Sequence, residues 1–210
     1  MPIFLHAAFW ASVLYFIRVP LRVGHARLVG PIFVVAVLLA KVVILDQFVT
    51  MPDLLGAALA LVFDRSGRVV GAANHLRLLA ALFMLAVVIG RLWPFELRAT
   101  PHAFGWVPLA SFMQGSIAVN AQSILQKAFL YGSALVLLFD AGVALVWASG
   151  ILCTMLLATS VAQTFLVGRS GEITDTLLAL ILALLFSQID GQRFQRKTSW
   201  RKPTGSRRPA

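Results

Sequence analysis

Residues 143–166 read VALVWASGILCTMLLATSVAQTFL and hold no charged side chain. A run of this length matches the roughly 20 apolar residues that an α-helix needs to cross a hydrocarbon core about 30 Å thick. Inside lipid the backbone must satisfy its own polar groups, which only helices and closed barrels achieve. The run therefore predicts a membrane-spanning helix, and it limits the chain to folds that contain one.

Similar runs recur along the chain, which is 60% hydrophobic and only 12% charged. Soluble domains are typically about 45–50% apolar and about 25% charged. We therefore expect an all-α fold, a polytopic transmembrane helical bundle with six or seven spans. The count depends on the weakest run, residues 52–64, which at 1.5 Å per residue reaches about 20 Å and is either a short span or a re-entrant segment. The other candidate spans are residues 3–17, 30–48, 76–92, 125–139 and 172–188.

The positions of Lys and Arg predict the orientation. Most of the 18 lie in residues 18–27, 65–77 and 193–208, which fall on one side of the membrane if every candidate crosses. Lys and Arg accumulate in cytoplasmic loops, so we expect a multi-pass protein with a cytoplasmic C-terminus. The net charge of +10 then reflects topology and attraction to membrane lipid, and we expect no nucleic-acid partner.

We divide the chain into four parts on this basis. The connection between the fourth and fifth candidates carries several Pro and Trp residues and is expected to lie in the outer membrane interface, with a short amphipathic helix near 109–124. A turn is expected at residues 64–68, and disorder from residue 193. The parts are N-terminal transmembrane helices (1–92), an extracytoplasmic interfacial loop (93–124), C-terminal helices (125–190) and a basic cytoplasmic tail (191–210).

A polar island, VGRSGEITD, separates the last two apolar runs and is expected at the outer surface. Glu172 and Asp175 are three residues apart and share a helix face, and Arg169 is within reach of either. One interpretation is a helix start with its own ion pair. The other is an outer-face site in which Arg169 binds an anionic headgroup. Gln163, near the end of the preceding span, either joins helices or faces this site.

Lys41 falls near the middle of the second candidate span, where a charge is costly and is expected to have a partner. Asp46, Asp53 and Asp140 are the candidates. We favour a buried pair between helices over a role in substrate binding.

Two motifs resemble those of the VanZ-like family of membrane proteins. The segment RLWPF (91–95) is similar to the family's Pro-Phe motif at a helix end. The pattern Q-x-x-x-x-G-R-S-x-[DE]-I-x-D resembles the segment between the last two helices of the family. The chain departs from the family pattern at Ser160, Ala179 and Leu182. The matching residues are Gln163, Gly168, Arg169, Ser170, Glu172, Ile173 and Asp175.

The resemblance implies a localisation, the bacterial inner (cytoplasmic) membrane within the cell envelope, and does not imply a particular reaction. The founding member of the family is associated with reduced susceptibility to the antibiotic teicoplanin. The resemblance covers about half of the chain, residues 91–188, and marks residues 125–190 as the VanZ-like C-terminal helices.

Three functional hypotheses follow. In the first, an outer-face pocket binds an anionic cell-envelope ligand, such as a lipid-linked glycan or peptidoglycan precursor. In the second, the chain is a membrane enzyme acting on a lipid or polysaccharide intermediate, with Glu172 or Asp175 as base. In the third, it is a structural subunit of a membrane protein complex. No catalytic motif is recognisable, and we expect no cofactor or metal. The candidate ligand-binding residues are Arg91, Arg98, Gln163, Arg169, Glu172 and Asp175.

Overall fold

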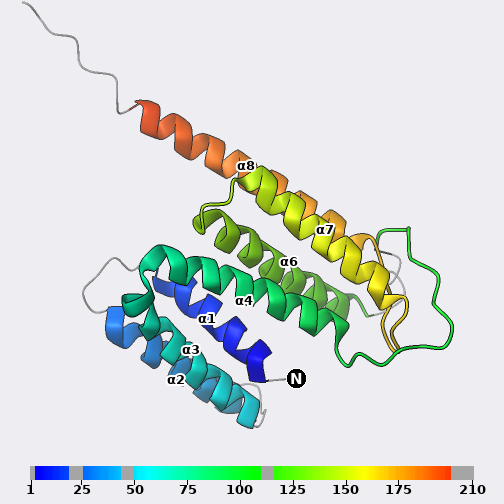
Figure 1. Cartoon of the computed structure of the whole chain (residues 1–210), viewed down its shortest axis with the longest axis horizontal. Coiled ribbons are helices and arrows are strands. Elements are labelled where there is room, and N and C mark those ends of the chain that lie inside the picture. The colour runs from blue at the N-terminus through cyan, green and yellow to red at the C-terminus, as the bar shows by residue number, and fades with distance from the viewer. Residues whose placement is uncertain (1–2, 19–25, 44–49, 110–115, 200–210) are drawn as a thin grey trace, which may run out of the picture.

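The computed structural model describes residues 3–18, 26–43, 50–109 and 116–199, and this part of the chain is helical without strands (Figure 1). Within these described residues, three helices are long and apolar enough to cross a membrane, over Ala73–Leu92, Val119–Asp140 and Leu145–Gln163. The total of six or seven spans therefore remains a prediction. The helices are α1 (Ile3–Arg18), α2 (Ala26–Val43), α3 (Met51–Val70), α4 (Ala72–Leu92), α6 (Ile117–Asp140), α7 (Leu145–Gln163) and α8 (Thr174–Ser199).

Three boundaries differ from the sequence predictions. The turn expected at 64–68 is wrong, because α3 continues through it and is separated from α4 by Gly71, whose φ of 85° suits a residue without a side chain. Of the helix expected near 109–124, residues 110–115 lie outside the described residues, and residues 117–124 form the start of α6, which begins at Ile117. The disorder expected from residue 193 is also wrong as far as Ser199, because α8 continues to that residue.

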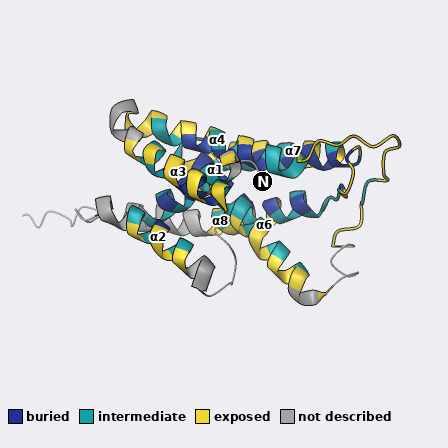
Figure 2. Cartoon of the chain, turned by 90° about the horizontal axis from the view of Figure 1, so that it is seen from below, coloured by how far each residue is buried: buried dark blue, intermediate teal, exposed yellow. Residues whose placement is uncertain are grey.

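The helices form two groups joined by α4 and α6. α1 packs mainly against α3 and α4, while α7 and α8 pack against each other and against α6 (Figure 1). Buried residues line the inward faces, and among the fully buried side chains are Phe83, Leu135 and Leu152 (Figure 2).

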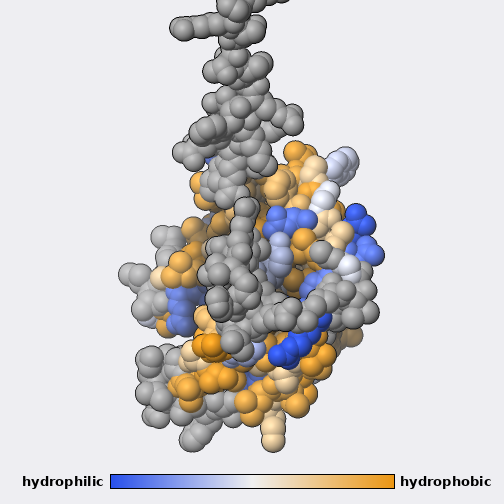
Figure 3. Space-filling model, turned by 90° about the vertical axis from the view of Figure 1, so that its left-hand side faces the viewer, coloured by the Kyte–Doolittle hydropathy of each residue, from blue (hydrophilic) through white to orange (hydrophobic). Residues whose placement is uncertain are grey.

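Large apolar side chains also cover much of the outer surface, as the view from the left-hand side of the molecule shows (Figure 3). Ile32, Val62, Val146 and Trp147 are each more than 60% exposed. A soluble protein rarely exposes apolar surface so widely, whereas a lipid-facing surface requires it.

α1 and α3 approach closely at Gly56. A Cβ atom placed on Gly56 would lie 2.5 Å from the Cβ of His6, so only glycine fits without a shift. One helical turn earlier in α3, Asp53 Oδ1 lies 3.0 Å from His6 Nδ1. The close approach of the two helices therefore also brings together an ionisable pair.

The loop after α4 folds back onto the turn between α7 and α8 (Figure 1). Backbone N–H groups of Arg98, His102 and Gly105 donate to the carbonyls of Phe165, Thr164 and Gly171, each at 2.8 Å. This contact places the C-terminal ends of α4 and α7 beside the N-terminal end of α8.

Candidate functional site

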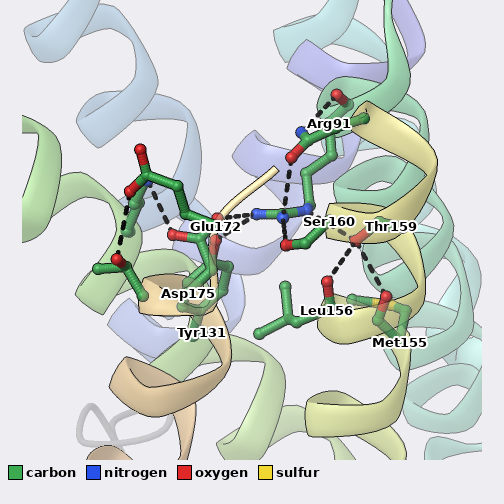
Figure 4. Close-up of polar contacts among 11 residues, drawn as sticks. Arg91, Tyr131, Met155, Leu156, Thr159, Ser160, Glu172 and Asp175 are labelled. Carbon is green, nitrogen blue, oxygen red and sulfur yellow. Dashed lines mark hydrogen bonds and ion pairs between the residues drawn. The ribbon is translucent and has the colours of Figure 1, made fainter. Parts of the chain in front are cut away.

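Arg91 is the centre of a polar cluster where α4, α6, α7 and α8 meet (Figure 4). Its side chain is 10% exposed. A guanidinium group has five N–H donors, and the protein provides five acceptors for them. The acceptors are Thr159 Oγ1 (2.8 Å from Nε), Tyr131 OH (2.7 Å from Nη1), Asp175 Oδ2 (from Nη1), Ser160 Oγ (2.7 Å from Nη2) and Gln163 Oε1 (3.3 Å from Nη2).

Helical spacing explains why α7 supplies three of these acceptors. Thr159, Ser160 and Gln163 occupy adjacent positions on one face of the helix, and all three are buried. Gln163 also donates from Nε2 to the carbonyl oxygen of Arg91 at 2.9 Å, which satisfies an acceptor at the end of α4. Gln163 therefore joins two helices, as one of its two sequence interpretations predicted.

Asp175 carries the negative charge of the cluster from the first turn of α8. One carboxylate oxygen accepts from Arg91, and the other lies 2.8 Å from Lys127 Nζ on α6. Lys127 and Tyr131 are four residues apart and so present both side chains on the same face of α6. The Asp175 carboxylate is therefore held between two cations.

The turn between α7 and α8, which carries Arg169, is held against α7 at Gly171. This residue is buried, and a Cβ atom on it would lie 2.1 Å from the carbonyl oxygen of Ser160. No side chain fits at that distance. The absence of a side chain thus lets the turn reach the helix that supplies the acceptors for Arg91.

Arg169 does not pair with Glu172 or Asp175 in the described structure, as the sequence had suggested that it could. Its Nε and Nη2 donate to the carbonyl oxygen of Trp93, at 3.2 and 2.8 Å. Asp175 is instead paired with Arg91 and Lys127, which are 84 and 48 positions away along the chain. Local spacing had placed Asp175 within reach of Arg169, whereas helix packing gives this carboxylate distant partners.

The other predicted site residues lie outside the cluster. Arg98 is exposed and is held through its backbone N–H. Glu172 precedes α8 and accepts a hydrogen bond from Thr174 Oγ1 at 3.3 Å. The side chain of Lys41 is outside the described residues, so its pairing remains a prediction. Among its suggested partners, Asp140 accepts a 2.7 Å hydrogen bond from Tyr15 OH.

A cavity of about 490 Å³ lies beside the cluster. Five residues with polar side chains from the cluster or beside it line the cavity, namely Arg91, Lys127, Tyr131, Gln163 and Arg169. Most of the remaining wall is apolar and comes from α1, α4 and α6. The apolar residues are Phe9, Trp10, Phe83, Ala86, Val87 and Leu130.

His6 and Asp53 provide a second polar position on the cavity wall. Asp53 is already satisfied, since Oδ2 accepts from the backbone N–H and the hydroxyl of Thr50 at 3.0 and 2.7 Å and Oδ1 pairs with His6. No group of three or more His, Cys, Asp or Glu side chains that could hold a metal ion is found among the residues that the structure describes.

Four residues at the site were not among those predicted from the sequence, namely Lys127, Tyr131, His6 and Asp53. A signal for the first two was present, because a Lys and a Tyr four residues apart inside an apolar run mark a polar stripe on one helix face. Nothing in the sequence linked His6 to Asp53, which meet only because α1 packs on α3.

Comparison with known proteins gives no match: no family model, no curated protein and no solved structure is significantly similar to the chain.

Proposed function

We propose that the chain is a VanZ-like membrane protein of the bacterial envelope that binds an anionic amphiphile in the cavity beside Arg91. The observation that carries the proposal is that a single cavity is lined both by apolar side chains and by the cationic side chains of Arg91, Lys127 and Arg169. Its volume of about 490 Å³ is within the range of roughly 300–1,000 Å³ that is usual for ligand pockets.

The apolar wall suits a hydrocarbon chain. Phe9 and Trp10 of α1 face the cavity together with Phe83 and Val87 of α4. The helices around the cavity also expose apolar side chains on their outer surfaces. An acyl or isoprenoid chain in the cavity would therefore lie in surroundings similar to those of the bilayer.

Lys127 and Arg169, rather than Arg91, are the groups suited to bind the anionic head. The five N–H donors of Arg91 are matched by acceptors from the protein, so a ligand would have to displace one of them. Lys127 has three donors and pairs with one carboxylate, and its side chain is 40% exposed. Arg169 directs Nε and Nη2 to the Trp93 carbonyl, which leaves the Nη1 donors for a ligand.

In this proposal Arg91 organises the site. Its contacts fix the ends of α4 and α7 and the start of α8, and Asp175 in turn positions Lys127. The predicted topology places this end of the molecule at the outer membrane face, where lipid-linked glycan and peptidoglycan precursors are processed.

A second candidate function is that of a structural subunit in a membrane protein complex. It is favoured by the internal satisfaction of the Arg91 cluster and by the exposed apolar loop residues beside it, among them Trp106 and Val107. An enzymatic role for Asp175 has less support, because a carboxylate held between two cations is a poor base.

The test is to identify the lipids that remain bound when the full chain is extracted in a mild detergent. We expect anionic amphiphiles to be enriched over their share in the parent membrane, and the enrichment to fall in Lys127→Gln and Arg169→Gln. Arg77→Gln, which removes an exposed charge near the other end of α4, is the matched control. Unselective lipid retention, or enrichment that survives both pocket variants, would exclude the proposal. A fixed stoichiometry with another membrane protein would support the structural alternative instead.

A further inference from the structure

The charges around the cavity define the kind of anion that fits it. The cavity wall contains three side chains with a permanent positive charge, Arg91, Lys127 and Arg169. The carboxylates near them are Asp175, which lies against two of these cations, and Asp53, which is held by His6 and Thr50. Glu172 does not line the cavity.

The direct contacts show which charges are balanced. Arg91 and Asp175 form a pair that is about 90% buried on both sides. Lys127 shares this same carboxylate, and the acceptor of Arg169 is a neutral carbonyl group. Because Arg91 balances Asp175, Lys127 and Arg169 each bring a positive charge to the cavity. The other carboxylate on the wall, Asp53, is held by His6 and Thr50.

We infer that the cavity selects an amphiphile with a terminal, dianionic phosphate, a phosphomonoester or diphosphate, over a phosphodiester lipid. This inference rests on the proposed function. A phosphomonoester carries about −1.5 to −2 charges near pH 7 and offers three terminal oxygens, whereas a diester carries one charge and offers two such oxygens. Two cations with several N–H donors match the first group in both charge and number of acceptors.

The apolar wall determines the source of the phosphate. A soluble phosphate ester would place no group against Phe9, Trp10, Phe83 or Val87 and would lose the contribution of the apolar surface. The ligand is therefore a lipid with a phosphate at its end, not a free phosphate metabolite.

The experiment compares two lipids that differ by one methyl group, dioleoyl phosphatidic acid and dioleoyl phosphatidylmethanol. Binding to the detergent-solubilised full chain is measured by native mass spectrometry at pH 7.5, with dioleoyl phosphatidylcholine as the neutral reference. We expect phosphatidic acid to bind at least about tenfold more tightly than phosphatidylmethanol, because its second charge lies against two cations. Millimolar glycerol 3-phosphate should not compete.

The variants show whether the two cations cause the preference. In Lys127→Gln and Arg169→Gln the ratio of the two affinities should fall to about threefold or less, while Arg77→Gln keeps the wild-type ratio. The melting temperature of each variant is measured in the same detergent, and the ratio is compared among variants that melt as the wild type does. Each cation is tested separately, so one folded pocket variant is sufficient.

The outcomes are distinct. Equal binding of the two anionic lipids, both above phosphatidylcholine, would overturn the inference and leave the proposed function in place. Failure of both to exceed phosphatidylcholine would overturn the inference and the proposed function together. Competition by glycerol 3-phosphate at the affinity of the lipid would overturn the assignment to a lipid.

Discussion

Arg91→Met is expected to destabilise the protein strongly while leaving its hydrophobic surface almost unchanged. Methionine retains the apolar part of the side chain and removes all five donors, so Tyr131, Ser160 and Asp175 each lose a partner at a buried position. Removing one member of a buried ion pair costs about 3–5 kcal/mol.

We place the expected loss near the lower limit, about 3 kcal/mol, because Lys127 continues to pair with Asp175. For a chain of this size that corresponds to a fall of about 6–12 °C in melting temperature. The assay is thermal unfolding of the full chain in detergent, monitored by circular dichroism. Arg77→Met is the control, since Arg77 is exposed on the same helix and its Nε makes a 3.5 Å contact with the carbonyl of Ala141.

A double variant separates the ion pair from the loss of packing. If Arg91 and Asp175 interact as described, Arg91→Met combined with Asp175→Asn will destabilise less than the sum of the two changes, by roughly 1–3 kcal/mol. A melting temperature of Arg91→Met within about 2 °C of wild type would refute the reasoning. Strict additivity of the two changes would refute it as well.

Two further predictions concern the turn and the topology. Gly171→Ala should destabilise the protein by about 1–3 kcal/mol and lower the yield of folded protein, because the added Cβ would lie 2.1 Å from the Ser160 carbonyl oxygen. The control is Gly150→Ala, whose Cβ would meet nothing within 4 Å. Equal effects of the two substitutions would contradict the described packing. After replacement of Cys153, single cysteines at Ser170 and Ser206 should be labelled by a membrane-impermeant thiol reagent from opposite sides of the membrane. Labelling of both from the same side would contradict the predicted topology.

Two of the helix positions followed closely from the sequence, because apolar runs depend on local composition. The runs at 76–92 and 143–166 correspond to α4 and α7 within a few residues. The end of α3 was missed because Gly67 lies inside the helix and Gly71 ends it, and the sequence does not distinguish a glycine that continues a helix from one with a positive φ.

Three of the six residues predicted for the site belong to the Arg91 cluster. Arg91, Gln163 and Asp175 were identified as polar residues at helix ends, and the structure brings them together. Their partners could not be predicted, because the choice between Arg169 and Arg91 for Asp175 depends on how four helices pack. Local spacing favoured the nearer arginine, and the close contact of Gly171 with α7 favours the distant one.

The walls of the cavity come from both halves of the chain, so the first 90 residues supply part of its lining. A fragment that starts just before Arg91 would contain every acceptor of its guanidinium group together with Lys127 and Arg169. It would lack the aromatic side chains of α1 and the His6–Asp53 pair. Such a fragment would lack part of the apolar wall against which, in the proposed function, a hydrocarbon chain lies.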